Sequence, residues 1–157
     1  MICDLNKWDD DRLKMVCATV EDVDDEGVQR LIQDMHDTLK ATGNGVGLAA
    51  PQVARGAKEL LRVMIIKPDA RLPGLVLINP EIIWQTEDLE VAQEGCLSYP
   101  GVFTDVPRHR SVKVRYITHR GEPATQLFTR VDARIVQHEL DHLEGVCVIR
   151  DAWRNTC

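Results

Sequence analysis

Two histidines stand one helical turn apart near the end of the sequence, in His138-Glu139-Leu140-Asp141-His142. Imidazoles at this spacing can bind one metal ion, and the carboxylate between them can act as a general base toward a water molecule. The alternative interpretation is a pair of histidines buried on the core-facing side of a helix. The motif therefore predicts metal-assisted hydrolysis, provided that a third ligand lies elsewhere in the chain.

The segment that carries this motif has the periodicity of an amphipathic helix over residues 130–143. At about 100° per residue, one stripe of this helix holds four side chains: Val131, Ile135, His138 and His142. Glu139 lies at the edge of the stripe. Thr129 is the expected N-cap, and Gly145 is expected to end the helix. Two apolar side chains of the stripe are therefore predicted to lie beside the metal.

The third ligand must come from the part of the chain that precedes the helix. A metzincin would have a third histidine where Val148 stands, and only Glu144 and Asp151 follow His142 as acidic candidates. Cys96 is the upstream candidate, because a thiolate is a strong soft ligand and the glycine before it lets the backbone approach closely. A buried cysteine without a chemical role is the alternative.

A third segment is rich in small residues: Gly45-Val46-Gly47-Leu48-Ala49-Ala50-Pro51-Gln52. Glycine and alanine at this density suit a backbone that runs close to a neighbour, such as an extended ligand. A tight connection between a helix and a strand is the alternative interpretation.

The rest of the sequence predicts the elements that must position these three segments. Periodic apolar residues indicate a helix over residues 25–41, capped by Asp24 or Asp25 and ended by Gly43. Strands are expected at the following ranges: 61–66, 75–78, 81–85, 111–117 with its hairpin partner 124–129, and a strand-like segment at 146–149. Helices and strands are segregated along the chain, which predicts an α+β fold with short antiparallel or mixed sheets.

Composition excludes several classes of protein. The 157 residues suit one domain, over 1–157, and a net charge of −6 argues against a general nucleic-acid binder. No apolar run is long enough to span a membrane, and the N-terminus lacks a secretory signal, so we expect a cytoplasmic protein. Five scattered cysteines without a CxxC pair do not form a disulfide framework; Cys17 and Cys147 are expected in the core, and Cys3 and Cys157 at the surface.

Taken together, the three segments resemble the peptide deformylase family, whose motifs are G-x-G-x-A-A-x-Q, E-G-C-x-S and H-E-x-x-H. The chain matches each motif at every fixed position and in the family's order, and the resemblance covers about residues 8–150. It implies hydrolysis of the N-formyl group from the N-terminal formyl-methionine of newly synthesised polypeptides, with release of formate. It also implies a deformylase-like fold in which short sheets surround a central C-terminal helix that carries H-E-x-x-H.

The resemblance also implies the residues of the metal site. Cys96, His138 and His142 would bind one divalent ion per chain, with water at an open fourth position. In the family this ion is commonly Fe(II), although zinc, nickel or cobalt can occupy the site. Glu139 would accept the proton of the water and later deliver it to the leaving amine.

The substrate-binding residues follow from the same resemblance. The side-chain amide of Gln52 and the backbone N–H of Leu97 would stabilise the oxyanion of the tetrahedral intermediate. The backbone of Gly47 would pair with an extended peptide. The methionine side chain would occupy a pocket formed by Val46, Glu94, Val131, Ile135 and the carbon surface of His138. Glu94 is also expected to pair with Arg108.

The sequence departs from many bacterial relatives at two places. Only fifteen residues follow His142, too few for the long C-terminal helix that can dock relatives on the ribosome. The expected partners are formyl-methionyl nascent peptides and, transiently, the ribosome through some other surface, with no membrane and no specific nucleic acid. Phe103 and Asp105 lie where some relatives carry a basic residue near the substrate entrance, so preference beyond methionine is expected to differ.

Two other functions would use part of the same motifs. A zinc endopeptidase would use both histidines and Glu139, but it leaves Cys96 and Gln52 without a role. A metal-binding protein without enzymatic activity would need neither Glu139 nor Gln52. Formate release from a formylated peptide distinguishes these alternatives from a deformylase.

Overall fold

The computed structural model describes residues 1–68 and 74–154. Its elements, in chain order, are η1 (Asp11–Lys14), α1 (Glu26–Ala41), β1 (Gly47–Ala49), η2 (Ala50–Gln52), η3 (Ala57–Glu59), β2 (Val63–Ile66), β3 (Leu75–Gln85), β4 (Leu89–Cys96), β5 (Tyr99–His109), β6 (Ser111–Ile117), β7 (Pro123–Thr129), α2 (Arg130–Leu143) and α3 (Val148–Arg154). The predicted α+β class is confirmed. None of the helices in the described ranges is long and apolar enough to cross a membrane.

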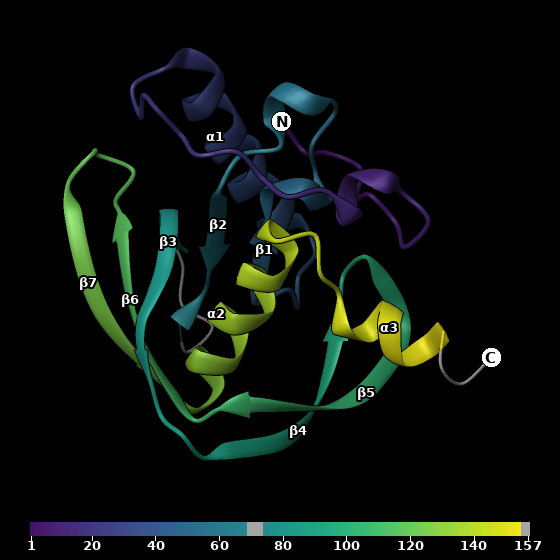
Figure 1. The fold of residues 1–157 in the computed structure, drawn as a ribbon. Coiled ribbons are helices and arrows are strands. Elements are labelled where there is room, and N and C mark those ends of the chain that lie inside the picture. The colour runs from purple at the N-terminus through teal and green to yellow at the C-terminus, as the bar shows by residue number, and fades with distance from the viewer. Residues whose placement is uncertain (69–73, 155–157) are drawn as a thin grey trace.

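Two antiparallel sheets surround α2, which lies at the centre of the molecule (Figure 1). The larger sheet has the strand order β1-β2-β3-β6-β7, so that β1 forms one of its edges, and the smaller sheet is the β4–β5 pair. Each sheet is antiparallel throughout its named strands. The H-E-x-x-H helix is therefore central, as the family resemblance implies.

The larger sheet buries side chains on both of its faces around β2. Val63 and Ile65 pack into one cluster with the apolar face of α1, while Met64 and Ile66 pack into a second cluster with α2. Successive side chains of a strand point to opposite faces, and a strand covered on both sides is continuously apolar. Alternate side chains of the run Val-Met-Ile-Ile therefore pack against α1 and against α2, and this burial holds α2 against the sheet.

Both predicted long helices are present, and their ends have clear causes. The Asp25 side chain caps α1 by accepting hydrogen bonds from the backbone N–H groups of Gly27 and Val28. Gly145 ends α2 with a φ of +71°, a conformation that glycine adopts readily. Thr129 is the N-cap of α2 by position, but its side chain makes no capping hydrogen bond, so the capping role predicted for it is wrong.

The structure corrects several predictions about strands. The two strands expected at 75–78 and 81–85 are one strand, β3, with an irregular register between Ile78 and Glu81. Asn79 has a φ of +49° there, so Asn79-Pro80 forms a bulge instead of a break. The prediction of a strand-like segment at 146–149 is wrong, because α3 begins at Val148. The hairpin of β6 and β7 is confirmed.

The β4–β5 pair is the main element that the sequence analysis missed. Most side chains of β4 are exposed, as are many of β5, so neither strand shows a strong alternation of apolar and polar residues. The pairing itself is extensive, running from Leu89 opposite His109 to Gly95 opposite Phe103. This hairpin matters for function, because β4 ends at Cys96.

Candidate metal centre

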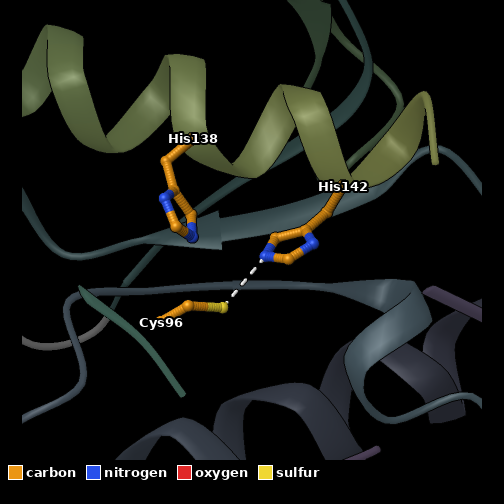
Figure 2. Close-up of side chains that lie close together, drawn as sticks. All are labelled: Cys96, His138 and His142. Atoms are coloured by element: carbon orange, nitrogen blue, oxygen red, sulfur yellow. Dashed lines mark hydrogen bonds between the residues drawn. The ribbon is translucent and has the colours of Figure 1, made fainter. Parts of the chain in front are cut away.

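Three potential metal ligands converge between β4 and α2. The ligand atoms of Cys96, His138 and His142 all lie within 4.8 Å of one another. Sγ of Cys96 lies 3.3 Å from Nε2 of His142, and both imidazoles extend from α2 toward the cysteine (Figure 2). The helical turn places the two rings edge to face, with centroids 5.0 Å apart, and the end of β4 supplies the thiol.

The spacing and chemistry of this cluster fit a divalent cation. Tetrahedral ligands at 2.0–2.3 Å from an ion lie about 3.5 Å from each other, close to the observed Cys96–His142 separation. Burial lowers the pKa of His142 well below its ordinary value, so the ring is neutral and offers a lone pair. A hydrogen bond with Cys147, together with burial, raises the pKa of the Cys96 thiol in the absence of an ion. A cation would favour the thiolate instead.

Glu94 holds the ring of His138 in place. Its Oε1 lies 3.0 Å from Nδ1 of His138, an arrangement that directs Nε2 of the ring toward the other two ligands. Arg108 binds Glu94 through two hydrogen bonds of 2.9 Å each, which confirms the predicted pair. Burial alone would raise the pKa of Glu94, but the hydrogen bonds from His138 and Arg108 lower it to about 2. Glu94 is therefore a fixed negative charge behind His138, a potential metal ligand.

Arg134 is a member of this network that the sequence analysis did not identify. Its Nη1 donates to Oε2 of Glu94 at 2.7 Å and to the carbonyl of Val106 at 2.8 Å, and its Nη2 donates to the carbonyl of Glu90 at 2.6 Å. Arg134 thus ties α2 to both strands of the smaller sheet. The signal was present in the sequence, because residue 134 precedes His138 by one helical turn and shares its face.

Glu139 is buried beside the three ligands with a free carboxylate oxygen. Its residue exposure is 4 %, and its Oε2 has no hydrogen-bond partner among the described residues. Burial raises the pKa of Glu139 to about 7. A carboxylate of this kind can take up and release a proton near neutral pH.

Gly47 lies directly against Glu139, which changes the interpretation of the glycine-rich segment. A Cβ at residue 47 would lie 2.6 Å from Oε1 of Glu139 and 2.9 Å from Cγ2 of Ile135. The close neighbour that requires glycine here is therefore the Glu139 side chain itself. An extended ligand, the example given above for such a neighbour, is not needed to explain the glycine at this position.

Gln52 is held rigidly with its amide group near the thiol. Its Oε1 accepts a hydrogen bond of 2.9 Å from the backbone of Ala49, which fixes the side chain within η2. Its Nε2 then lies 3.2 Å from Oγ of Ser98 and 3.7 Å from Sγ of Cys96. The arrangement presents an N–H donor beside the thiol of Cys96.

A cavity of about 570 Å³ opens onto this cluster. Ten of the eleven residues predicted for the site line it: Val46, Gly47, Gln52, Glu94, Cys96, Leu97, Val131, Ile135, His138 and Glu139. His142, the eleventh, lies behind Cys96 with 1 % exposure. Val46 and Val131 are exposed at the rim, whereas Ile135 is buried. A cation site, a proton acceptor and an N–H donor thus share one cavity, a combination suited to hydrolysis of a polarised carbonyl.

Known proteins resemble the chain in sequence over nearly its whole length. The family model described as "Polypeptide deformylase" matches residues 2–156. A peptide deformylase of Pseudothermotoga lettingae is 45% identical over 137 residues, which are 87% of this chain and 75% of that protein. Peptide deformylase 2 of Vibrio parahaemolyticus is 45% identical over 136 residues, covering 87% of this chain and 77% of the relative.

Solved structures of peptide deformylases also resemble the chain in fold over nearly its whole length. A peptide deformylase from Legionella pneumophila superimposes with a TM-score of 0.87 at 32% identity, covering 99% of this chain and 92% of that one. A class I type b peptide deformylase from Acinetobacter baumannii, described as bound to Met-Ala-Ser, has a TM-score of 0.84 at 34% identity, covering 95% and 97%. The sequence comparisons and the structure comparisons thus point to the same family.

Proposed function

The chain belongs to the peptide deformylase family, and on that premise we propose which of its residues carry out the family's reaction. The reaction is the metal-dependent removal of the N-formyl group from nascent polypeptides. The observation that carries the assignment is the position of Glu139, which lines the cavity beside the Cys96, His138 and His142 cluster and whose buried Oε2 has no hydrogen-bond partner among the described residues. Neither a simple metal store nor a structural metal site needs such a carboxylate.

We assign Cys96, His138 and His142 as the ligands of one divalent ion. The chemistry that such an ion supplies when bound is Lewis acidity, which lowers the pKa of water toward neutrality. A thiolate with two imidazoles suits several borderline metals, and we propose Fe(II), with zinc, nickel and cobalt as substitutes. Glu94 acts through His138, because its hydrogen bond orients the ring.

Glu139 is the proposed general base and acid. Its carboxylate accepts a proton from the attacking water and then delivers that proton to the amine that leaves the formyl carbon. Burial supports this role, since a pKa raised to about 7 makes both transfers accessible near neutral pH. The contact with Gly47 supports it further, because that contact limits where the carboxylate can lie.

Gln52 and Leu97 are the proposed donors to the oxyanion. The Nε2 group of Gln52 is fixed on the Cys96 side of the cavity by the hydrogen bond that Oε1 accepts from Ala49. Leu97 follows the thiol ligand directly and lines the same cavity. Donors that are oriented before the reaction stabilise developing negative charge without a reorganisation cost.

The formylated peptide is proposed to lie along β1. This strand forms an edge of the larger sheet, so that its free side, including Gly47, can pair with an extended chain. Val46, Val131, Ile135 and Glu94, with the carbon surface of His138, would then enclose the methionine side chain. The Acinetobacter relative described as bound to Met-Ala-Ser supports a substrate that begins with methionine.

The setting of this activity follows from its substrate. Formyl-methionyl chains emerge from a bacterial-type ribosome, and so we propose that the protein works in the cytosol and meets the ribosome transiently. We also propose that residues 1–157 form a single catalytic domain.

The proposal is tested by formate release from formyl-Met-Ala-Ser, measured anaerobically with Fe(II)-loaded protein. We expect Glu139→Ala to retain the metal and to lose turnover by a factor on the order of 10²–10⁴, the usual contribution of a general base. Glu144→Ala is the matched control, because Glu144 is an exposed carboxylate at the end of the same helix that pairs with Arg62. Full activity of Glu139→Ala would show that the assigned base is wrong.

Metal binding has its own pair of variants. Cys96→Ala should lower the metal content of the purified protein, because it removes the only thiolate ligand of the proposed set. Cys17→Ala is the control, since Cys17 is a buried cysteine in a different apolar cluster. Equal metal content in the two variants would remove Cys96 from the ligand set.

A further inference from the structure

A second thiol lies against the proposed metal ligand. The thiol is that of Cys147, which lies in the apolar cluster against which Cys96 packs, and the proximity of the two thiols raises the pKa of Cys96 and lowers that of Cys147. Cys147 forms a small apolar cluster with Tyr99 and Ile149, and Cys96 packs against that cluster. The contact is tertiary: Cys96 ends β4, whereas Cys147 immediately precedes α3, which lies beside β5 in Figure 1.

Nothing in the proposed deformylation uses Cys147. It is 2 % exposed, does not line the cavity and is not one of the three side chains whose ligand atoms lie within 4.8 Å of one another. Cys96, in contrast, faces the cavity. A small oxidant that enters the cavity therefore meets Cys96 first, with Cys147 directly behind it.

We propose that Cys96 and Cys147 form a reversible disulfide when a hydroperoxide enters the cavity. Sγ of Cys96 attacks the O–O bond, which breaks to give a sulfenic acid at Cys96 and one molecule of water or alcohol. Sγ of Cys147 then attacks the Cys96 sulfur, the S–S bond forms, and the hydroxyl leaves as water with the Cys147 proton. The two thiols lose two electrons in total, and the hydroperoxide gains them.

The disulfide would have two consequences for the metal site. Cys96 would cease to be a thiolate ligand, which leaves two histidines to hold the ion and should release it. Cys96 would also be protected, because a sulfenic acid that meets a second thiol forms a disulfide before it can be oxidised irreversibly to sulfinic or sulfonic acid. A dithiol reductant would restore the ligand set.

The test uses the zinc-loaded full chain, because zinc has no redox chemistry of its own. After treatment with hydrogen peroxide, a non-reducing digest analysed by mass spectrometry should contain a peptide pair linked between Cys96 and Cys147. Its mass should be about 2 Da below the sum of the free peptides, as expected for two lost hydrogens. Zinc should appear in solution in step with this product, and dithiothreitol should reverse both changes.

Cys147→Val is the comparison variant, since valine suits the apolar cluster. It should lose zinc to peroxide as well, but with Cys96 recovered as sulfinic or sulfonic acid and with no recovery by dithiothreitol. The proposal is overturned if the unmodified chain yields no Cys96–Cys147 peptide, if Cys96 pairs with another cysteine, or if both proteins recover equally. Because peptides and zinc are measured directly, the outcome is independent of whether the chain deformylates.

Discussion

Replacing Gly47 by alanine should impair catalysis through Glu139 while leaving the fold intact. The new Cβ would lie 2.6 Å from Oε1 of Glu139, whereas an ordinary contact begins near 3.4 Å. The carboxylate must therefore retreat by about 0.8 Å, and a misplacement of this order can cost about 10²-fold in rate. That loss corresponds to about 2.7 kcal/mol of transition-state stabilisation. Since the displaced atom is the end of a side chain, most of the cost should appear in activity.

The assay is the formate release described above, with kcat and KM measured separately and metal content determined for each sample. We expect Gly47→Ala to lower kcat with normal metal content. Gly56→Ala is the control, because a Cβ there meets nothing within 4 Å and its φ of −167° is open to any residue. In a Glu139→Ala background the Gly47→Ala change should have little further effect on kcat, since the two act through one group.

Two results would contradict this reasoning. A kcat within about threefold of the unmodified protein, with full metal content, would mean that Glu139 does not need its observed position. An effect confined to KM would mean that Gly47 matters only for pairing with the peptide backbone. Additive losses in the double variant would likewise separate Gly47 from Glu139.

Three further predictions concern stability and the support of the metal site. Folding lowers the pKa of Glu94 from 4.5 to about 2, so the ionised carboxylate stabilises the folded state above pH 4.5, and this contribution is lost as the pH falls toward 2. Urea unfolding of the metal-free protein should therefore show about 3 kcal/mol of stability that disappears in acid, and the Glu94→Gln variant should lack this pH-dependent part. Arg134→Met should weaken metal retention, measured by zinc competition with a chelator, and Arg134→Lys should restore it in part, because Arg134 ties Glu94 of β4 to α2, the helix that carries both histidines. Asp25→Ala should cost about 1 kcal/mol in urea unfolding without changing kcat, since it removes only the cap of α1.

Local patterns in the sequence are enough to identify the chemistry of the metal site. The spacing of His138 and His142 on an amphipathic helix places both rings on one face, because helical geometry is a property of neighbouring residues. The same periodicity places Val131 and Ile135 beside the rings, and both line the cavity. The three motifs together also indicate the family, and with it the fold.

Local patterns do not predict contacts between segments that are far apart in the sequence. The β4–β5 pair has mostly exposed side chains on β4 and was missed, although it delivers Cys96 to the histidines. The bulge at Asn79 was interpreted as a break, because residues that favour a turn can equally occupy an irregular position within a strand. The bulge depends on pairing of β3 with the distant strand β6, and the position of Cys96 depends on how the β4–β5 hairpin packs against α2.

The sequence by itself therefore determined which residues are candidates to hold a metal ion and to accept a proton, since residue type, helical spacing and the three motifs together single them out. Only the tertiary structure decided how those residues are supported. It packed Gly47 against Glu139, joined Arg134 to Glu94 and placed Cys147 behind Cys96. Each of these contacts joins segments far apart in the chain, and their closeness depends on how sheets and helices pack, which no local pattern encodes.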